Sequence, residues 1–126
     1  MWYNMAMKIL IDADGCPVVD MTLQAAAEHG LEAILFCDTS HEFKEKNARV
    51  VTVDKGSDSA DFALIRQVKP GDIVVTQDYG LAAMVLAKRG YPITQNGKRL
   101  TDANIDTLLL TRHAAKKARR GGYRLE

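Results

Sequence analysis

Two aspartates separated by a single residue follow a short apolar run near the start of this 126-residue chain. Residues 9–11, which follow Lys8, form the run and are aliphatic and largely β-branched like a buried strand. Asp12 follows it directly, and Asp14 comes two residues later. Gly15 and Pro17 then indicate a tight turn that leads into a helix. In an open α/β sheet, ligands bind at the carboxyl ends of the strands, so these two carboxylates stand where chemistry is expected.

Further aspartates stand at the ends of later apolar segments. Strands are predicted at residues 31–37, 49–53 and 72–76. The acids that follow these strands are Asp38, Asp54, Asp58, Asp61 and Asp78. Each acid alone also makes a good helix cap, and capping is an equal alternative for Asp58 and Asp78. As a set they would repel one another, by about 4 kcal/mol for a pair 4 Å apart near a protein surface, and a divalent cation would offset this repulsion.

The type of ligand indicates which ion would bind. The candidate ligands are carboxylate oxygens, whereas the chain has three histidines and two cysteines, and the cysteines are far apart in the sequence. Oxygen ligands favour Mg²⁺ or Mn²⁺ over zinc, and such ions take their remaining ligands from water and phosphate. The sequence therefore predicts hydrolysis of a phosphate ester, in which a metal-bound water attacks phosphorus and a spare carboxylate orients that water.

Strands and helices must alternate to bring these acids together, and the sequence predicts that they do. Helices are predicted at residues 17–28, around residues 62–68 and at residues 81–89, followed by a short edge strand at residues 91–94 and a last helix from residue 101 or 102. This order predicts a single three-layer α/β domain with a mainly parallel sheet. In such a sheet the acids that follow the strands would all lie along one edge.

Length and composition indicate one domain. With 126 residues, of which 47% are hydrophobic, the chain is long enough for one core and too short for two ordinary domains. The predicted organisation is a disordered lead at residues 1–6, a domain at residues 7–120 and a flexible tail at residues 121–126. No apolar run is long enough to span a membrane and no signal peptide is predicted, so a cytoplasmic location is expected. Cys16 and Cys37 are expected to be reduced, buried residues.

Charge is unevenly distributed along the chain. Residues 1–111 carry fifteen acidic and eleven basic residues, whereas residues 112–126 carry one acidic and six basic residues. The candidate nucleic-acid contacts in this last segment are Arg112, Lys116, Lys117, Arg119 and Arg120. On a helix they would cover nearly two turns and could follow a phosphate backbone. The alternative is a solvated helix end with a disordered tail.

Several motifs together make the chain similar to a known bacterial family. They are Asp12-Ala13-Asp14-Gly15-Cys16-Pro17, Ser40-His41, Asp58-x-x-Asp61, Thr76-Gln77-Asp78-x-x-Leu81-Ala82, Asn96-Gly97, Asn104-Ile105-Asp106 and Arg112-His113. With this set the chain resembles the YaiI/YqxD family over nearly everything after Ala6. The resemblance implies a PIN-like domain, whose nucleases hold Mg²⁺ or Mn²⁺ with acids after the first strand, on an early helix and after the fourth strand.

The resemblance places those metal-binding roles on Asp12, Asp61 and Asp78. Asp14 and Asp58 are further catalytic candidates, and RNA is the expected substrate. Gly15 stands where the family is expected to have alanine. No fourth acid follows Asp78 at a matching interval, so the number of metal ions stays open.

Two other functions remain open on the sequence. A small-molecule phosphatase would use Asp12 as its nucleophile, because Asp-x-Asp after a first strand is also the pattern of haloacid-dehalogenase-like enzymes. Those enzymes usually continue with Thr or Val, where this chain has Cys16. A non-catalytic RNA-binding or regulatory module would keep the acids without using them. His41, after the second strand, is either a proton shuttle or a hydrogen-bonded loop residue.

Overall fold

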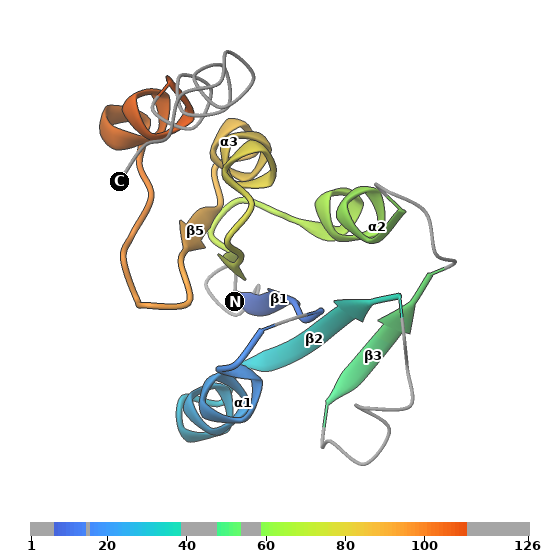
Figure 1. The fold of residues 1–126 in the computed structure, drawn as a ribbon. Coiled ribbons are helices and arrows are strands. Elements are labelled where there is room, and N and C mark those ends of the chain that lie inside the picture. Colours follow the sequence, from blue (N-terminus) through green and yellow to red (C-terminus); the bar gives the residue numbers. More distant parts are fainter. Residues whose placement is uncertain (1–6, 15, 39–47, 54–58, 111–126) are drawn as a thin grey trace.

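Five parallel strands form the centre of the molecule (Figure 1). The computed structural model of the chain describes residues 7–14, 16–38, 48–53 and 59–110. The strands are β1 (Lys8–Asp12), β2 (Glu32–Cys37), β3 (Arg49–Thr52), β4 (Ile73–Val75) and β5 (Tyr91–Ile93). Every neighbouring pair runs parallel, as the alternation of strands and helices predicts.

The strand order is β3-β2-β1-β4-β5, which makes β1 the central strand. The chain builds outward from β1 through β2 to β3, and then returns to the other side of β1 with β4 and β5. Leu10 is the register partner of Ile34 on one side and of Val74 on the other. The gap between the carboxyl ends of β1 and β4 is therefore the place where the winding direction reverses.

Helices cover both faces of the sheet (Figure 1). Helix α1 (Val19–Glu28) packs on one face, where Val19 and Ala26 join a buried cluster with Ile11 and Leu35. Because parallel strands covered on both faces have no solvent side, their sequences are almost continuously apolar rather than alternating.

The opposite face carries α2 (Ser59–Gln67) and α3 (Tyr79–Ala87). A second buried cluster there contains Phe36 from the sheet, Leu64 from α2 and Val85 from α3. The predicted three-layer α/β domain is thus confirmed.

A fourth helix, at residues 102–110, packs against the outer side of α3 (Figure 1). Its Ile105 meets Ala82 of α3 and the buried Leu100. Thr101 caps this helix, because its Oγ1 accepts a hydrogen bond from the Asn104 amide while the Asn104 side chain accepts one from the Thr101 amide. Of the two caps considered from the sequence, Thr101 is the one used.

Two helices begin at other residues than the sequence predicts. Helix α1 begins at Val19 rather than at Pro17, because residues 17 and 18 lie in a turn before it. Helix α3 begins at Tyr79 rather than at Leu81, because Asp78 caps it from outside.

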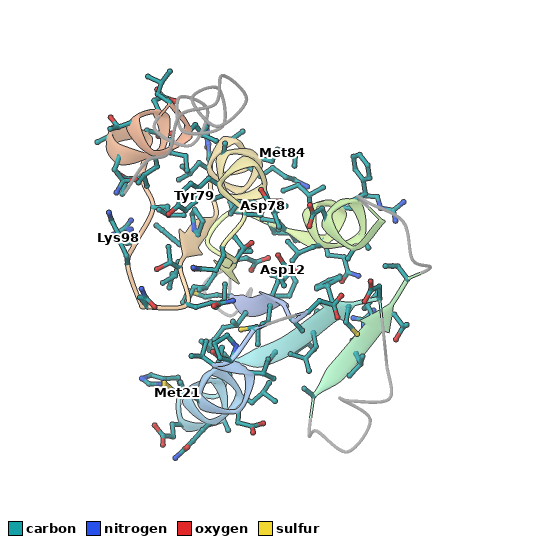
Figure 2. All side chains as sticks on the ribbon, in the orientation of Figure 1. Asp12, Met21, Asp78, Tyr79, Met84 and Lys98 are labelled. Atoms are coloured by element: carbon teal, nitrogen blue, oxygen red, sulfur yellow. The ribbon has the colours of Figure 1, made fainter. Side chains whose placement is uncertain are left out.

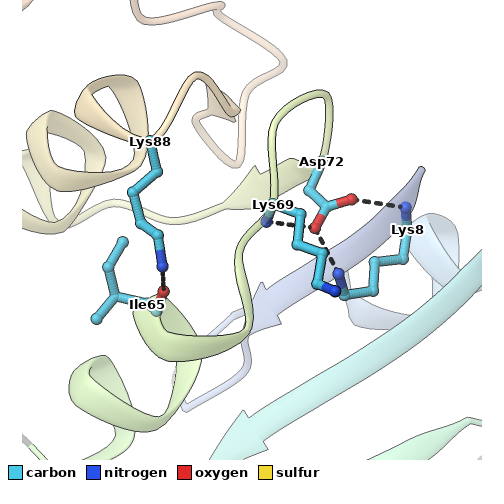
Figure 3. Close-up of polar contacts among 5 residues, drawn as sticks. All are labelled: Lys8, Ile65, Lys69, Asp72 and Lys88. Atoms are coloured by element: carbon cyan, nitrogen blue, oxygen red, sulfur yellow. Dashed lines mark hydrogen bonds and ion pairs between the residues drawn. The ribbon is translucent and has the colours of Figure 1, made fainter. Parts of the chain in front are cut away.

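A buried carboxylate fixes the amino-terminal edge of the sheet (Figure 3). Asp72 is 2% exposed and accepts hydrogen bonds from the Lys8 amide, the Lys8 ammonium group and the Lys69 amide. Three donors around one carboxylate satisfy a charge whose burial would otherwise be costly. This network joins the start of β1 to the turn before β4.

Some predictions concern residues outside the described part of the chain. These are the lead at residues 1–6 and the tail at residues 121–126. Among the described residues, no helix has the length and hydropathy needed to cross a bilayer.

Candidate acidic site at the sheet edge

Asp12 and Asp78 both lie at the point where the winding of the sheet reverses. Asp12 is the last residue of β1, and Asp78 lies three residues beyond the end of β4. Both side chains lie in the space between β1 and the start of α3 (Figure 2). Ligands of doubly wound sheets bind in this crevice, so the two acids occupy the position expected of a site.

Thr76 connects the two acids. Its Oγ1 donates a hydrogen bond to Asp12 Oδ2 at 3.0 Å and accepts one from the Asp78 amide at 3.0 Å. The Thr76 side chain is 1% exposed, so neither bond competes freely with water. One buried hydroxyl therefore holds the Asp12 carboxylate and the backbone of the loop that carries Asp78.

Asp78 also performs the capping role that the sequence left as an alternative. Its Oδ1 accepts hydrogen bonds from the Gly80 amide at 2.9 Å and the Leu81 amide at 3.1 Å. These amides are two of the unpaired donors at the start of α3, and a carboxylate there is favoured by the helix dipole. Capping uses only Oδ1, and no described residue donates a hydrogen bond to Oδ2.

The surroundings of Asp12 favour its protonated form. Burial raises the pKa of the Asp12 carboxyl above its ordinary value. The hydrogen bond from Thr76 opposes this rise, and the negative charge of Asp78 adds to it. The ionised carboxylate is therefore held in a partly desolvated place beside a like charge, an arrangement that a cation would relieve.

A second pair of acids lies beside the first. The Asp38 amide donates a hydrogen bond to Asp14 Oδ2 at 2.7 Å. Desolvation raises the pKa of Asp14, and the hydrogen bond from the Asp38 amide lowers it. A hydrogen bond with the Asp38 side chain raises this pKa again, as do the negative charges of Asp38 and Asp12. The net direction is upward, which makes the Asp14 carboxylate a stronger base than an ordinary aspartate.

The two cysteines differ in their burial. Cys37 is buried as predicted, whereas Cys16 is only half-buried. Desolvation raises the pKa of the Cys16 thiol, and the Asp12 charge raises it further, against a hydrogen bond from the Val18 backbone. A raised pKa leaves little thiolate, so Cys16 has the character of an unreactive thiol.

The third expected ligand, Asp61, belongs to a different element, helix α2. Asp61 lies half-buried in the first turn of α2. In the described ranges, no three His, Cys, Asp or Glu side chains lie close enough together to hold one metal ion. The shared role of Asp61 with Asp12 and Asp78 therefore stays a prediction.

Other expected site residues lie outside the described part of the chain. They are Asp58, Arg112, Lys116, Lys117, Arg119, Arg120 and the loop residue His41.

Sequence reasoning counted Asp38 among the acids at the sheet edge without pairing it with Asp14, and it assigned no role at the site to Thr76. A polar residue that closes an otherwise apolar strand, directly before Gln77 and Asp78, is the signal that would have identified Thr76. Asp38 follows a strand in the same way as Asp12, but its pairing with Asp14 depends on the neighbouring positions of β1 and β2.

Comparison with known proteins places the chain in a family. The profile described as "Uncharacterized BCR, YaiI/YqxD family" matches residues 10–126. The UPF0178 protein of Exiguobacterium sibiricum is 53% identical over 118 residues, which are 94% of this chain and 81% of that protein. The UPF0178 protein of Ruminiclostridium cellulolyticum is 52% identical over 118 residues, 94% of this chain and 77% of that protein. No solved structure matches significantly. The chain therefore belongs to the YaiI/YqxD family.

Proposed function

We propose that this protein is a metal-dependent nuclease that hydrolyses phosphodiester bonds in RNA. The observation that carries the proposal is the unit formed by Asp12, Thr76 and Asp78 at the reversal point of the sheet. Burial and the negative charge of Asp78 both disfavour the ionised form of Asp12, so this arrangement costs stability unless a ligand uses it. The PIN-like nuclease role implied by the sequence resemblance agrees with this position.

The chemistry of the donors fits Mg²⁺ or Mn²⁺. Magnesium is usually bound by one or two carboxylates and completes its octahedron with water and phosphate oxygens, so Asp12 and Asp78 are a sufficient set. No described residue donates a hydrogen bond to Asp12 Oδ1 or to Asp78 Oδ2. When bound, the ion would polarise the phosphoryl group and increase the acidity of a water molecule.

The residues of the chain have separable tasks in this proposal. Thr76 fixes the orientation of Asp12, and the first turn of α3 fixes Asp78 through its Oδ1. Asp14 is exposed at the same edge, and its raised pKa suits it to accept a proton from the attacking water. Asp38 holds Asp14 in place through its amide.

The proposed polymer substrate rests on charge. The basic segment 112–126, with its candidate contacts Arg112, Lys116, Lys117, Arg119 and Arg120, would bind the phosphates of a polymer backbone. A small phosphate ester would need no such segment, which is why RNA is proposed over a phosphomonoester.

A cleavage assay tests the proposal. The full chain is incubated with Mn²⁺ or Mg²⁺ and with end-labelled single-stranded RNA, single-stranded DNA or a generic phosphomonoester. We expect metal-dependent cleavage of RNA by the wild type and a loss of about a hundredfold or more in Asp12→Asn, because an amide is a poor ligand for these ions. Binding of Mn²⁺, followed by electron paramagnetic resonance, should weaken in the same variant.

Asp106→Asn is the matched control, since Asp106 is an exposed aspartate on the helix at residues 102–110, away from the acidic edge. It should cleave RNA as the wild type does. Hydrolysis of the phosphomonoester alone would move the assignment to a phosphatase with Asp12 as nucleophile. RNA binding without any cleavage, equal in wild type and Asp12→Asn, would assign a non-catalytic RNA-binding module.

A further inference from the structure

A cavity lined by two arginines lies beside the outer edge of the sheet, and none of its lining residues belongs to the acidic edge. It has a volume of about 290 Å³ and is formed where the end of α3, the start of β5 and the start of the helix at residues 102–110 meet. These elements lie on the same side of the molecule in Figure 1. Its lining residues are Leu86, Arg89, Gly90, Tyr91, Arg99, Leu100, Thr101 and Asp102.

The cationic side chains of this cavity are available to a ligand. Arg89 and Arg99 are both exposed, and within the described ranges neither forms an ion pair with an acid. Asp102 is the acid among the lining residues, so the arginines outnumber it two to one. The cavity therefore has a net positive charge, which favours an anionic ligand.

Arg99 is already oriented. Its guanidinium carbon lies 4.8 Å from the centre of the Tyr91 ring, in a cation–π contact. This contact restrains the guanidinium group over the ring, and its N–H groups can still donate hydrogen bonds. A guanidinium held in this way loses less entropy when it donates two parallel hydrogen bonds to a phosphate.

Arg89 occupies a backbone position that normally belongs to glycine. Its φ is 64°, and the amides of Arg89 and Gly90 close α3 by donating to the carbonyls of Leu86 and Val85, both at 2.9 Å. Helix α1 ends in the same motif with Gly30 at the equivalent place, at φ 65°. The chain thus keeps an arginine where glycine would be more stable, which points to a use for its side chain.

We propose that this cavity binds a phosphate group, held by the guanidinium groups of Arg89 and Arg99. The proposal uses no residue of the acidic edge, so it does not depend on the proposed nuclease activity. The phosphate could belong to a small molecule or to a polynucleotide, since both present the same oxygens to the arginines.

Nuclear magnetic resonance titration of the ¹⁵N-labelled full chain tests the proposal and separates the two sources. The probes are inorganic phosphate, adenosine monophosphate and a short oligoadenylate, each at constant ionic strength and without added metal. We expect shifts of amide signals centred on residues 86–102. Shifts with all three probes would assign a small-phosphate site, and shifts with the oligonucleotide alone would assign a contact with a strand.

Three variants sharpen the test. Arg89→Gly and Arg99→Gln should each weaken binding about tenfold or more, because each removes a charge-assisted contact. Arg89→Gly relieves the backbone conformation, so a loss of binding in that variant cannot come from misfolding. Asp102→Asn should tighten binding, because it removes the negative charge from the lining.

Arg66→Ala is the control, since Arg66 is an exposed arginine on α2 that does not line the cavity. It should bind each probe as the wild type does. The proposal is wrong if none of the probes shifts residues 86–102, or if Arg89→Gly and Arg99→Gln bind as tightly as Arg66→Ala.

Discussion

Replacing Thr76 with valine removes the hydroxyl that connects the two acids and keeps the shape of the side chain. The variant loses the hydrogen bond to Asp12 Oδ2 and the acceptor for the Asp78 amide, both 3.0 Å long in the wild type. A bond to a charged group contributes about 1.5 to 3 kcal/mol and a neutral one about 1 kcal/mol. The free energy of unfolding should therefore fall by about 2.5 to 4 kcal/mol at neutral pH, a large share of the stability of a small domain.

The loss should depend on pH, because Thr76 stabilises the ionised form of Asp12. The hydrogen bond lowers the pKa of Asp12, so its charge-assisted part is present above that pKa and disappears as the pH falls through it. Without the hydroxyl, the pKa of Asp12 should rise further. Urea unfolding at neutral and acidic pH measures the stability change, and ¹³C titration of the Asp12 carboxyl carbon measures the pKa.

Thr94→Val is the matched control. Thr94 is 7% exposed near the end of β5, and its Oγ1 accepts one hydrogen bond, from the Lys98 amide at 3.1 Å. In this variant the free energy of unfolding should fall by about 1 kcal/mol at either pH, and the pKa of Asp12 should stay unchanged. An equal loss in the two variants at neutral pH, or an unchanged Asp12 pKa in Thr76→Val, would refute the connecting role of Thr76.

Three further predictions concern stability and are measured by urea or thermal unfolding. Asp12→Asn should be more stable than the wild type at neutral pH without added metal. Because the pKa of Asp12 is raised in the folded state, Asp12 favours folding most below its unfolded pKa and less as the pH rises through its folded pKa. The stability gained in Asp12→Asn should therefore vanish in acid. A gain of equal size at neutral and acidic pH would contradict this. The free energy of unfolding should rise by about 1 kcal/mol in Arg89→Gly and fall by about 1 kcal/mol in Gly30→Ala, because both positions have positive φ. Stability changes of the same sign in the two variants would exclude this account. The free energy of unfolding should fall by about 3 kcal/mol in Asp72→Ala, since the Lys8 amide, the Lys8 ammonium group and the Lys69 amide lose their acceptor. A fall below about 1 kcal/mol would show that water replaces the carboxylate.

The class of fold follows from the sequence because its signals are local. Residues 8–11 and 72–76 are segments of strand length with apolar centres, and turn residues separate them from helical patterns. This local order is sufficient to predict alternating strands and helices, parallel pairing and acids at one sheet edge. The helix starts were the least accurate part, because Asp78 has the features of a cap and of a site residue at once.

The site itself depends on which strands are neighbours, and local patterns do not contain that information. The order β3-β2-β1-β4-β5 places β4 beside β1 and so brings Thr76 and Asp78 to Asp12, more than sixty residues earlier in the chain. The same order places Asp38 beside Asp14.

The sequence by itself thus determined that Asp12, Asp14, Asp38 and Asp78 end their strands on a common edge, because side-chain chemistry and strand length are properties of short segments. Only the tertiary structure decided which acids pair, which oxygens are already used and which hydroxyl joins Asp12 to the Asp78 loop. These are properties of strand register and burial, which arise when distant segments pack together and water is excluded between them.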